Sequence, residues 1–210
     1  PGSSVDEDML NACIDPEYSL PGSCSEPCVA GIDTGGSQGD RHNVIVLREG
    51  RLMYVGIVRN EREIIDLYQR FNVRVSVIDA GPERRMVRRV QVAHKGTFRC
   101  NYLNGKSEET EISRPKVQHG RKVTVNRTDS MDTVHEYIGR QKLVLPFNAK
   151  LLDDGQFYDQ MQTPTRVYDE DRQMYIWTEV GADHYYHAMN YALIADTLWT
   201  QIKGIKARSS

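Results

Sequence analysis

Three acidic residues of this 210-residue chain stand at positions where side chains often do chemistry. Asp33 ends a short apolar run and is followed by glycines, within Gly-Ile-Asp-Thr-Gly-Gly at 31–36. Asp79 ends a second apolar run, and Asp183 comes just before a long stretch with helical spacing. Converging carboxylates repel one another unless cations neutralise them, and Mg²⁺ and Mn²⁺ prefer oxygen ligands. The three residues therefore predict a site for one or two divalent ions.

Two such ions about 4 Å apart can clamp a phosphodiester for in-line attack by water. His184 and His187 lie one and four positions after Asp183. Because residues i and i+4 share one face of a helix, His187 could bind the same ions or orient a water, and His184 is a further candidate ligand. Taken singly, each acid could instead be an ordinary turn, strand-end or helix-capping residue.

The glycines beside Asp33 have two interpretations. Gly35 and Gly36 place no side chain near the carboxylate, which leaves room for a phosphate-bearing backbone or permits a tight turn. A dinucleotide-binding turn is excluded because no helical pattern follows the first apolar run. No complete phosphate-binding P-loop motif occurs in the sequence.

The elements that must position these residues follow from hydrophobic periodicity. Strands are predicted at 29–33, in two runs of 42–59 joined at Gly50, and at 73–79, 97–103 and 122–126. Helices are predicted at 61–71, 83–93, 130–138 (N-capped by Asp129 or Ser130) and 182–199. The last helix has a buried stripe of Tyr185, Ala188, Met189, Ala192, Ala195 and Trp199. This order predicts a mixed α/β sheet with three antiparallel strands, then parallel strands.

Charge is unevenly distributed along the chain, although the net charge is only −2. The middle, residues 84–142, holds 14 Lys and Arg against 6 Asp and Glu, and both flanking segments are acidic. This pattern indicates either a face that binds a polyanion or a solvated surface. If the partner is DNA, cations near Asp79 and around 122–126 would contact backbone phosphates. The candidates are Arg84, Arg85, Arg88, Arg89, Lys116, Arg121, Lys122 and Arg127.

The N-terminal region lacks periodicity. Residues 1–4 resemble a cloning scar, and residues 5–28 are predicted to be an irregular lead-in or linker. Cys13, Cys24 and Cys28 could hold zinc only with a fourth ligand, so free thiols are the favoured interpretation. No apolar run approaches the length that spans a bilayer, and no secretory signal pattern opens the sequence.

Three of these stretches resemble a known family, the C-terminal nuclease domain of the large terminase subunit of tailed bacteriophages. They are GIDTGG at 31–36, VIDAGPE at 77–83 and ADHYYHAMNYALIA at 182–195. The resemblance extends from about Val29 to Trp199. The family often shows Asp-His-x-x-Asp-Ala followed by Tyr, where this chain has Asp183, His184, His187 and, further on, Tyr191.

The resemblance implies an RNase H-like fold and a metal-dependent endonuclease that cuts concatemers of double-stranded viral DNA during genome packaging by two-metal-ion hydrolysis. Asp33 and Asp79 match the family's first two metal-binding carboxylates. The third ligand is either Asp183 or His187, because the family's acid falls where this chain has histidine.

The same resemblance implies a context for the chain. Residues 1–28 would be a tag remnant and a linker from a missing ATPase domain, and residues 29–210 would be the nuclease domain. The implied partners are double-stranded DNA, an ATPase motor on the same polypeptide, the small terminase subunit and the portal, without a membrane. The implied location is the host-cell cytoplasm.

Other functions share the same core. A fragment of an actin-like or Hsp70-like ATPase would bind ATP phosphates at the Asp-Thr-Gly-Gly segment 33–36, although such ATPases need two lobes and this sequence contains one. A catalytically inactive nucleic-acid-binding module and a Holliday-junction resolvase are further alternatives. DNA cutting, ATP hydrolysis and binding to four-way junctions distinguish them.

Overall fold

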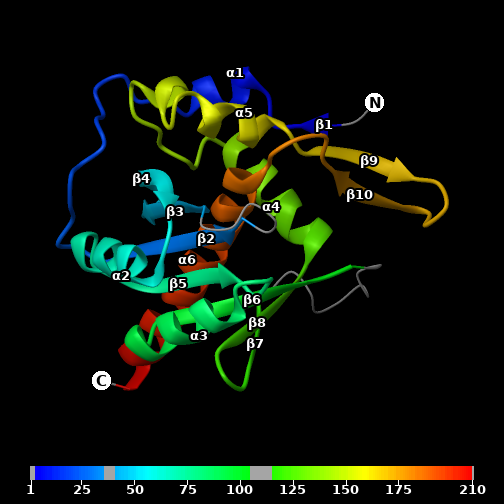
Figure 1. Cartoon of the computed structure of the whole chain (residues 1–210). Coiled ribbons are helices and arrows are strands. Elements are labelled where there is room, and N and C mark those ends of the chain that lie inside the picture. The colour runs from blue at the N-terminus through cyan, green and yellow to red at the C-terminus, as the bar shows by residue number, and fades with distance from the viewer. Residues whose placement is uncertain (1–2, 36–40, 105–114, 210) are drawn as a thin grey trace.

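A computed structural model describes residues 3–35, 41–104 and 115–209 of the chain. Its centre is a seven-stranded sheet in the order β4-β3-β2-β5-β6-β8-β7 (Figure 1). The strands are β2 (Cys28–Thr34), β3 (His42–Arg48), β4 (Arg51–Val58), β5 (Val73–Asp79), β6 (Thr97–Leu103), β7 (Lys116–Gln118) and β8 (Lys122–Asn126). Strands β2, β3 and β4 pair antiparallel, whereas β5, β6 and β8 continue the sheet in parallel. The predicted mixed α/β topology is confirmed.

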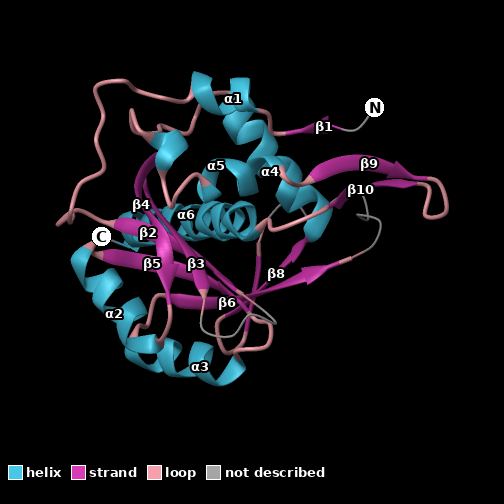
Figure 2. Cartoon of the chain, turned by 45° about the horizontal axis from the view of Figure 1, so that its top comes forward, coloured by secondary structure: helices cyan, strands magenta, loops and turns pink. Residues whose placement is uncertain are grey.

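Helices cover both faces of this sheet. One face carries α2 (Glu61–Arg70) and α3 (Arg84–Ala93), and the other carries α6 (His184–Ser209) with α4 (Arg127–Gly139) and α5 (Gln156–Gln162) (Figure 2). Alternation along the strands divides the core accordingly: Val29 and Val77 pack with the residues of α6, whereas Ile32 and Ile78 pack with those of α2 and α3. The two layers thus place α6 on one side of β2 and β5, and α3 on the other.

Helix α6 packs directly onto strand β2 at Gly31. A Cβ at this position would lie 2.0 Å from the backbone oxygen of Ala188 and 2.2 Å from the backbone nitrogen of Ala192. Only glycine permits this approach, because real Cβ contacts are essentially never that short. The predicted stripe of α6 is buried from Tyr185 to Ala195, and Trp199 is partly buried. This contact holds the start of α6 over the end of β2.

Helix α4 begins three residues earlier than the sequence predicts. Its N-cap is Asn126, whose side chain accepts a hydrogen bond of 3.1 Å from the backbone nitrogen of Asp129, so the prediction of Asp129 or Ser130 as the cap is wrong. Asn126 is also the last residue of β8, and the helix therefore follows the strand without a loop. Strand β7 pairs antiparallel with β8, and the two strands form a hairpin.

The N-terminal segment is irregular only in part, because residues 3–12 form a short strand and a helix, whereas residues 15–27 form neither. Helix α1 (Glu7–Ala12) is capped by Asp6, and both Val5 and Leu10 are fully buried in the core that contains α6. Strand β1 (Ser3–Ser4) pairs with β9 (Thr165–Asp169), which pairs in turn with β10 (Met174–Thr178) in a second, three-stranded sheet. A short 3₁₀ helix, η2 (Ala149–Leu151), precedes α5. The first residues therefore pack as part of the domain, because Val5, Leu10 and Cys13 lie in its core.

Cys13, Cys24, Cys28 and Cys100 form no disulfide bond. Burial raises the pKa of Cys13 to about 11 and that of Cys28 to about 12, so both thiols are neutral near pH 7. Within the described residues, no helix combines the length and the hydropathy that crossing a membrane requires, α6 included.

Candidate metal centre

Asp33 and Asp79 lie next to each other because their strands are parallel neighbours. Ile32 of β2 is in register with Ile78 of β5, so the acid that follows each isoleucine reaches the same edge of the sheet. The carboxylate of Asp79 accepts hydrogen bonds from the Thr34 hydroxyl (3.2 Å) and from the Gly81 backbone nitrogen (3.0 Å). Asp33 is only 8% exposed. The two strand-end acids thus lie side by side, and their role as metal ligands stays a prediction.

The two carboxylates repel each other. Burial raises the pKa of Asp79 above its usual range, and the negative charge of Asp33 raises it further. The hydrogen bonds from Gly81 and Thr34 act in the opposite direction without cancelling this shift. A cation between the two acids would relieve the repulsion.

The start of α6 brings the third acid to this edge. The carbonyl of Asp183 accepts backbone hydrogen bonds from Tyr186 (2.9 Å) and His187 (3.2 Å), so Asp183 is the residue that opens the helix. The next side chain, His184, lies with its Nδ1 2.8 Å from Oδ2 of Asp33. This hydrogen bond raises the pKa of His184, against the opposing effect of burial. His184 thus pairs with the buried carboxylate of Asp33.

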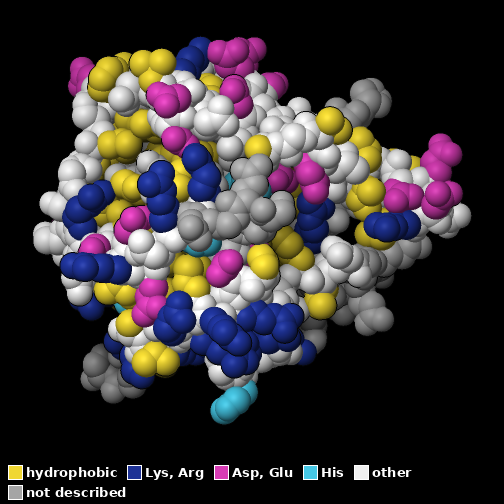
Figure 3. All heavy atoms as spheres, in the orientation of Figure 1, with side chains coloured by type: hydrophobic (Ala, Val, Ile, Leu, Met, Phe, Trp, Pro, Cys, Tyr) yellow, Lys and Arg dark blue, Asp and Glu magenta, His cyan; other side chains and the backbone are white. Residues whose placement is uncertain are grey.

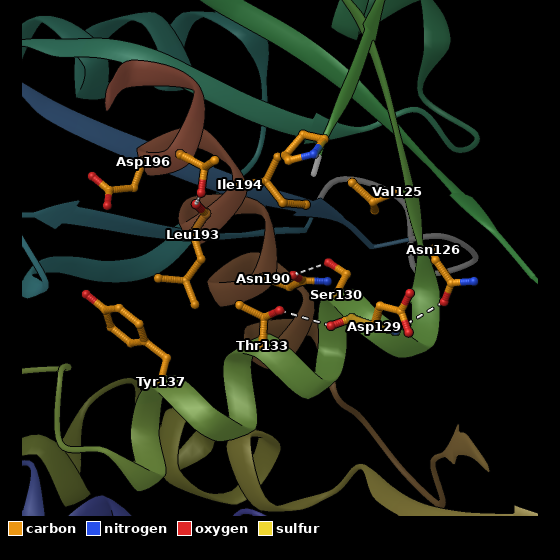
Figure 4. A pocket seen from close by; sticks show the side chains of 12 residues that line it. Val125, Asn126, Asp129, Ser130, Thr133, Tyr137, Asn190, Leu193, Ile194 and Asp196 are labelled. Atoms are coloured by element: carbon orange, nitrogen blue, oxygen red, sulfur yellow. Dashed lines mark hydrogen bonds between the residues drawn. The ribbon is translucent and has the colours of Figure 1, made fainter. Parts of the chain in front are cut away.

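Both nitrogens of His187 are hydrogen-bonded. Its Nε2 lies 3.0 Å from Oδ2 of Asp183, and its Nδ1 lies 2.9 Å from the hydroxyl of Tyr102. That hydroxyl accepts from the amide nitrogen of Asn190 (2.8 Å), and the amide oxygen of Asn190 accepts from Ser130 (2.6 Å) (Figure 4). Because a carboxylate can only accept, Nε2 of His187 donates its proton to Asp183.

This chain of hydrogen bonds orients Asp183. Burial alone would raise the pKa of the Asp183 carboxyl, but the hydrogen bond and charge of His187, together with the charges of His184 and Arg127, lower it. The tyrosine, asparagine and serine of the chain were not predicted as site residues. Asn190 lies three positions after His187 on the same helix face, which is a signal in the sequence, whereas Tyr102 and Ser130 arrive from other elements without one.

The donor set suits a divalent ion in chemistry and charge. Asp33, Asp79 and Asp183 offer carboxylate oxygens, the ligands that Mg²⁺ and Mn²⁺ prefer. Across the residues that the structure describes, however, no three His, Cys, Asp or Glu side chains form a group that could hold a metal ion as they stand. His184 is hydrogen-bonded to the carboxylate of Asp33, and His187 is hydrogen-bonded to that of Asp183. An ion bound by Asp33 would therefore have to replace His184.

The predicted DNA-contacting cations divide into two groups. Three make contacts within the protein: Arg89 pairs with Glu61, Arg127 pairs with Glu179, and Arg121 donates to four backbone carbonyls at residues 91–97. The others, Arg84, Arg85, Arg88, Lys116 and Lys122, have no ion-pair partner among the described residues. Figures 1 and 3 share one orientation. Lys and Arg side chains, dark blue in Figure 3, gather in the lower part of the molecule, where Figure 1 shows α3.

Gly35 makes a tight backbone contact. Its nitrogen donates to the carbonyl of Arg41 (3.2 Å), and a Cβ at Gly35 would lie 2.2 Å from that oxygen. This contact supports the interpretation of Gly35 as a turn residue. Gly36 lies outside the described residues.

The sheet, with acids at the ends of two adjacent central strands and a closing helix, has an RNase H-like fold. No protein-family model matches the chain, and no curated protein sequence is similar to it. Solved structures reveal the likeness that sequence comparison does not.

Several similar solved structures are nuclease domains of phage large terminases. The domain from bacterial virus Sf6 has a TM-score of 0.62 at 8% identity, covering 90% of this chain and 97% of its own. The large terminase nuclease from thermophilic phage G20c, with bound magnesium, has a TM-score of 0.56 at 12% identity, covering 88% and 93%. A mutant of the Sf6 domain was solved with manganese. The chain has the fold of these nuclease domains over about nine-tenths of its length.

A longer protein contains the same fold. The large terminase of thermophilic bacteriophage D6E matches 91% of this chain with a TM-score of 0.51 and 12% identity. The match takes up only 44% of the D6E chain.

Proposed function

We propose that this chain is a divalent-metal-dependent endonuclease that cuts double-stranded DNA. The observation that carries the proposal is the placement of Asp33 and Asp79 side by side, with the pKa of Asp79 raised by burial and by its neighbour's charge. Two buried acids that repel each other are costly for the fold unless a cation is bound. The metal-bound nuclease domains that share this fold support the same proposal.

We assign the third ligand to Asp183 rather than His187. A histidine binds a metal through a free ring nitrogen, and both nitrogens of His187 are already hydrogen-bonded, to Tyr102 and Asp183. The role proposed for His187 is therefore to fix the orientation of the Asp183 carboxylate, as outer partners of metal ligands commonly do. The hydrogen bonds of His187 therefore favour one of the two alternatives that the sequence leaves open.

The divalent ions would supply Lewis-acid activation of water and stabilise the charge that develops on the phosphoryl group; two ions would do so in the manner of other phosphodiester hydrolases. The chain's own residues then have distinct tasks. Asp33, Asp79 and Asp183 would hold the cations at the sheet edge, and His184 would leave Asp33 when they bind. Arg84 and Arg88 of α3, with Lys116 and Lys122 of the β7–β8 hairpin, would hold the DNA backbone.

The biological setting is part of the proposal. The fold shared with phage terminases favours cutting of concatemeric viral DNA during packaging, alongside an ATPase motor, a small terminase subunit and a portal, in the cytoplasm of the host cell. The 44% match to the D6E large terminase is consistent with a nuclease domain that works as part of a longer polypeptide. Residues 1–28 would then lie between the nuclease and that motor, with Val5 and Leu10 anchored in the nuclease core.

Incubation with supercoiled plasmid tests the proposal. With Mn²⁺ or Mg²⁺ the chain should nick or linearise the plasmid, and EDTA should stop the reaction. Asp33→Ala and Asp79→Ala should each abolish cutting, whereas Asp66→Ala, an exposed acid on α2, should not. Cutting by the first two variants at the parental rate would refute the metal centre. ATP hydrolysis with intact plasmid would favour the ATPase alternative.

The third ligand is tested by two further variants. Asp183→Ala should abolish cutting, because it removes a metal ligand. His187→Ala should reduce the rate about 10- to 100-fold, the usual cost of losing an outer partner of a ligand. The opposite ranking of these two variants would assign the metal to His187 instead.

A further inference from the structure

A basic pocket lies beside the candidate metal centre, on the opposite face of the sheet. The pocket has a volume of about 200 Å³ and is lined by Ala80, Arg84, Val87, Arg88, Arg99, Asn101 and Lys122. Ala80 directly follows Asp79, so the pocket opens at the end of β5, where the carboxylates are. Four of its lining residues are cations, and none is acidic.

Three elements build this pocket. Arg84 and Arg88 are one turn apart on α3 and project from one face of it. Arg99 of β6 is in register with Lys122 of β8, so these two side chains are neighbours on the sheet. Asn101 lies two residues after Arg99, on the same face of β6. The pocket is therefore held by the sheet and α3 rather than by loops.

The cations of this pocket lack counterions. Among the described residues, none of Arg84, Arg88, Arg99 and Lys122 forms an ion pair. The Nε of Arg99 is buried and has no hydrogen-bond partner in the described part of the chain. Other arginines nearby are satisfied: Arg89 pairs with Glu61, and Arg121 donates to backbone carbonyls. Clustered positive charges without partners favour a bound anion.

We propose that this pocket binds one backbone phosphate of the DNA, flanking the phosphate that is cut. The proposal rests on the proposed nuclease function. Guanidinium groups bind phosphate oxygens through paired hydrogen bonds, and the Asn101 amide adds a neutral donor. The phosphate cannot be the scissile one, because Arg99 and Asn101 lie on the α3 face of the sheet, whereas the candidate metal centre lies under α6. The pocket would fix the position of the strand relative to the carboxylates.

Arg99 and Asn101 are additions to the cations predicted from sequence. Arg85 provides a matched control, because it is exposed on the same helix and outside the pocket. A general electrostatic surface would use Arg85 and Arg88 equally. A phosphate pocket would use Arg88 and not Arg85.

The test is the salt dependence of duplex binding, measured by fluorescence anisotropy with a labelled 20-base-pair DNA in EDTA. Each neutralised phosphate contributes about 0.9 to the slope of log K against log salt. Arg88→Gln and Arg99→Gln should each make that negative slope shallower by about one and weaken binding about tenfold. Arg85→Gln should leave both quantities close to those of the parent.

Equal effects of Arg85→Gln and Arg88→Gln, or no effect of Arg88→Gln, would overturn the pocket. Arg88 is exposed, so its variant remains informative even if Arg99→Gln unfolds, which a thermal melt would reveal. If the parent chain bound inorganic phosphate in this pocket while the variants bound duplex DNA with the parental salt dependence, the assignment to DNA would also be overturned. Because EDTA removes the metal, these outcomes are independent of cutting. A parent chain that binds DNA in this way but never cuts it would refute only the nuclease function.

Discussion

Replacing Gly31 by alanine should separate α6 from the sheet and thereby disturb the candidate metal centre. The new Cβ would lie 2.0 Å and 2.2 Å from backbone atoms of α6, where ordinary contacts begin at 3.4 Å. The helix must therefore retreat by more than ~1 Å, since a backbone cannot rotate away as a flexible side chain can. Asp183 and His184 lie at the start of this helix, and His184 reaches Asp33 across 2.8 Å.

The size of the effect follows from two opposing contributions. Overpacking a core costs about 1–3 kcal/mol, and a clash against backbone belongs at the upper end. Losing a glycine gains back about 0.4–1 kcal/mol by restricting the unfolded chain. A net loss of about 2 kcal/mol corresponds to roughly 4–8 °C in Tm for a domain of this size. Displacement by ~1 Å should also reduce the cutting rate about 100-fold.

Thermal unfolding and plasmid cutting with Mn²⁺ measure these two effects. Gly22→Ala is the matched control, because a Cβ at Gly22 meets nothing within 4 Å. Its Tm and rate should stay near those of the parent. If Gly31→Ala unfolded within about 1 °C of the parent and cut at the same rate, the argument that this contact positions α6 would be wrong.

Three other perturbations have expected outcomes. Asp79→Asn should raise Tm while abolishing cutting. The variant removes a buried carboxyl, whose pKa is raised by burial and by the charge of Asp33, but keeps an oxygen that accepts from the Gly81 backbone. Asp66→Asn should change neither Tm nor cutting, and a lower Tm of Asp79→Asn would contradict the repulsion. Burial lowers the pKa of His94, so the unfolded chain binds more protons below about pH 6.5 and stability should fall as pH decreases through that value. His94→Gln should flatten the dependence of the free energy of unfolding on pH, measured by urea unfolding at several pH values, whereas His119→Gln, at an exposed position, should not. The same pH dependence in His94→Gln and the parent would refute the attribution to His94. Gly204→Ala, in an exposed turn of α6 with open space around it, should raise stability by about 0.5 kcal/mol, and a measurable loss would contradict the helical conformation there.

The central elements could be predicted because their periodicity agrees with their burial. The strand at 73–79 and the helix at 61–71 match β5 and α2 closely, since each has one clear apolar face or run. The candidate site follows from the same elements: acids at strand ends become neighbours once the strands are parallel. The pairing of Asp33 with Asp79 is such a case.

The rest depends on tertiary contacts that leave little trace in sequence. Helix α1 has one fully buried side chain, Leu10, and its short polar sequence resembles a linker until it packs against the core. Tyr102 and Ser130 meet His187 and Asn190 only in the folded chain, from β6 and α4. Every residue of helix α6 from Tyr185 to Ala195 is buried, so the apolar stripe alone could not indicate which residues face the carboxylates.

A crystal structure of the chain soaked in Mn²⁺, with anomalous diffraction locating the ions, tests the central claim most directly. The account predicts at least one manganese peak about 2.1 Å from carboxylate oxygens of Asp33 and Asp79, with Asp183 completing the protein ligands and His184 moved away from Asp33. Such a peak should be lost in Asp79→Asn. A structure in which these carboxylates bind no ion, or in which the ion is held by His187 while Asp183 stays apart, would contradict it.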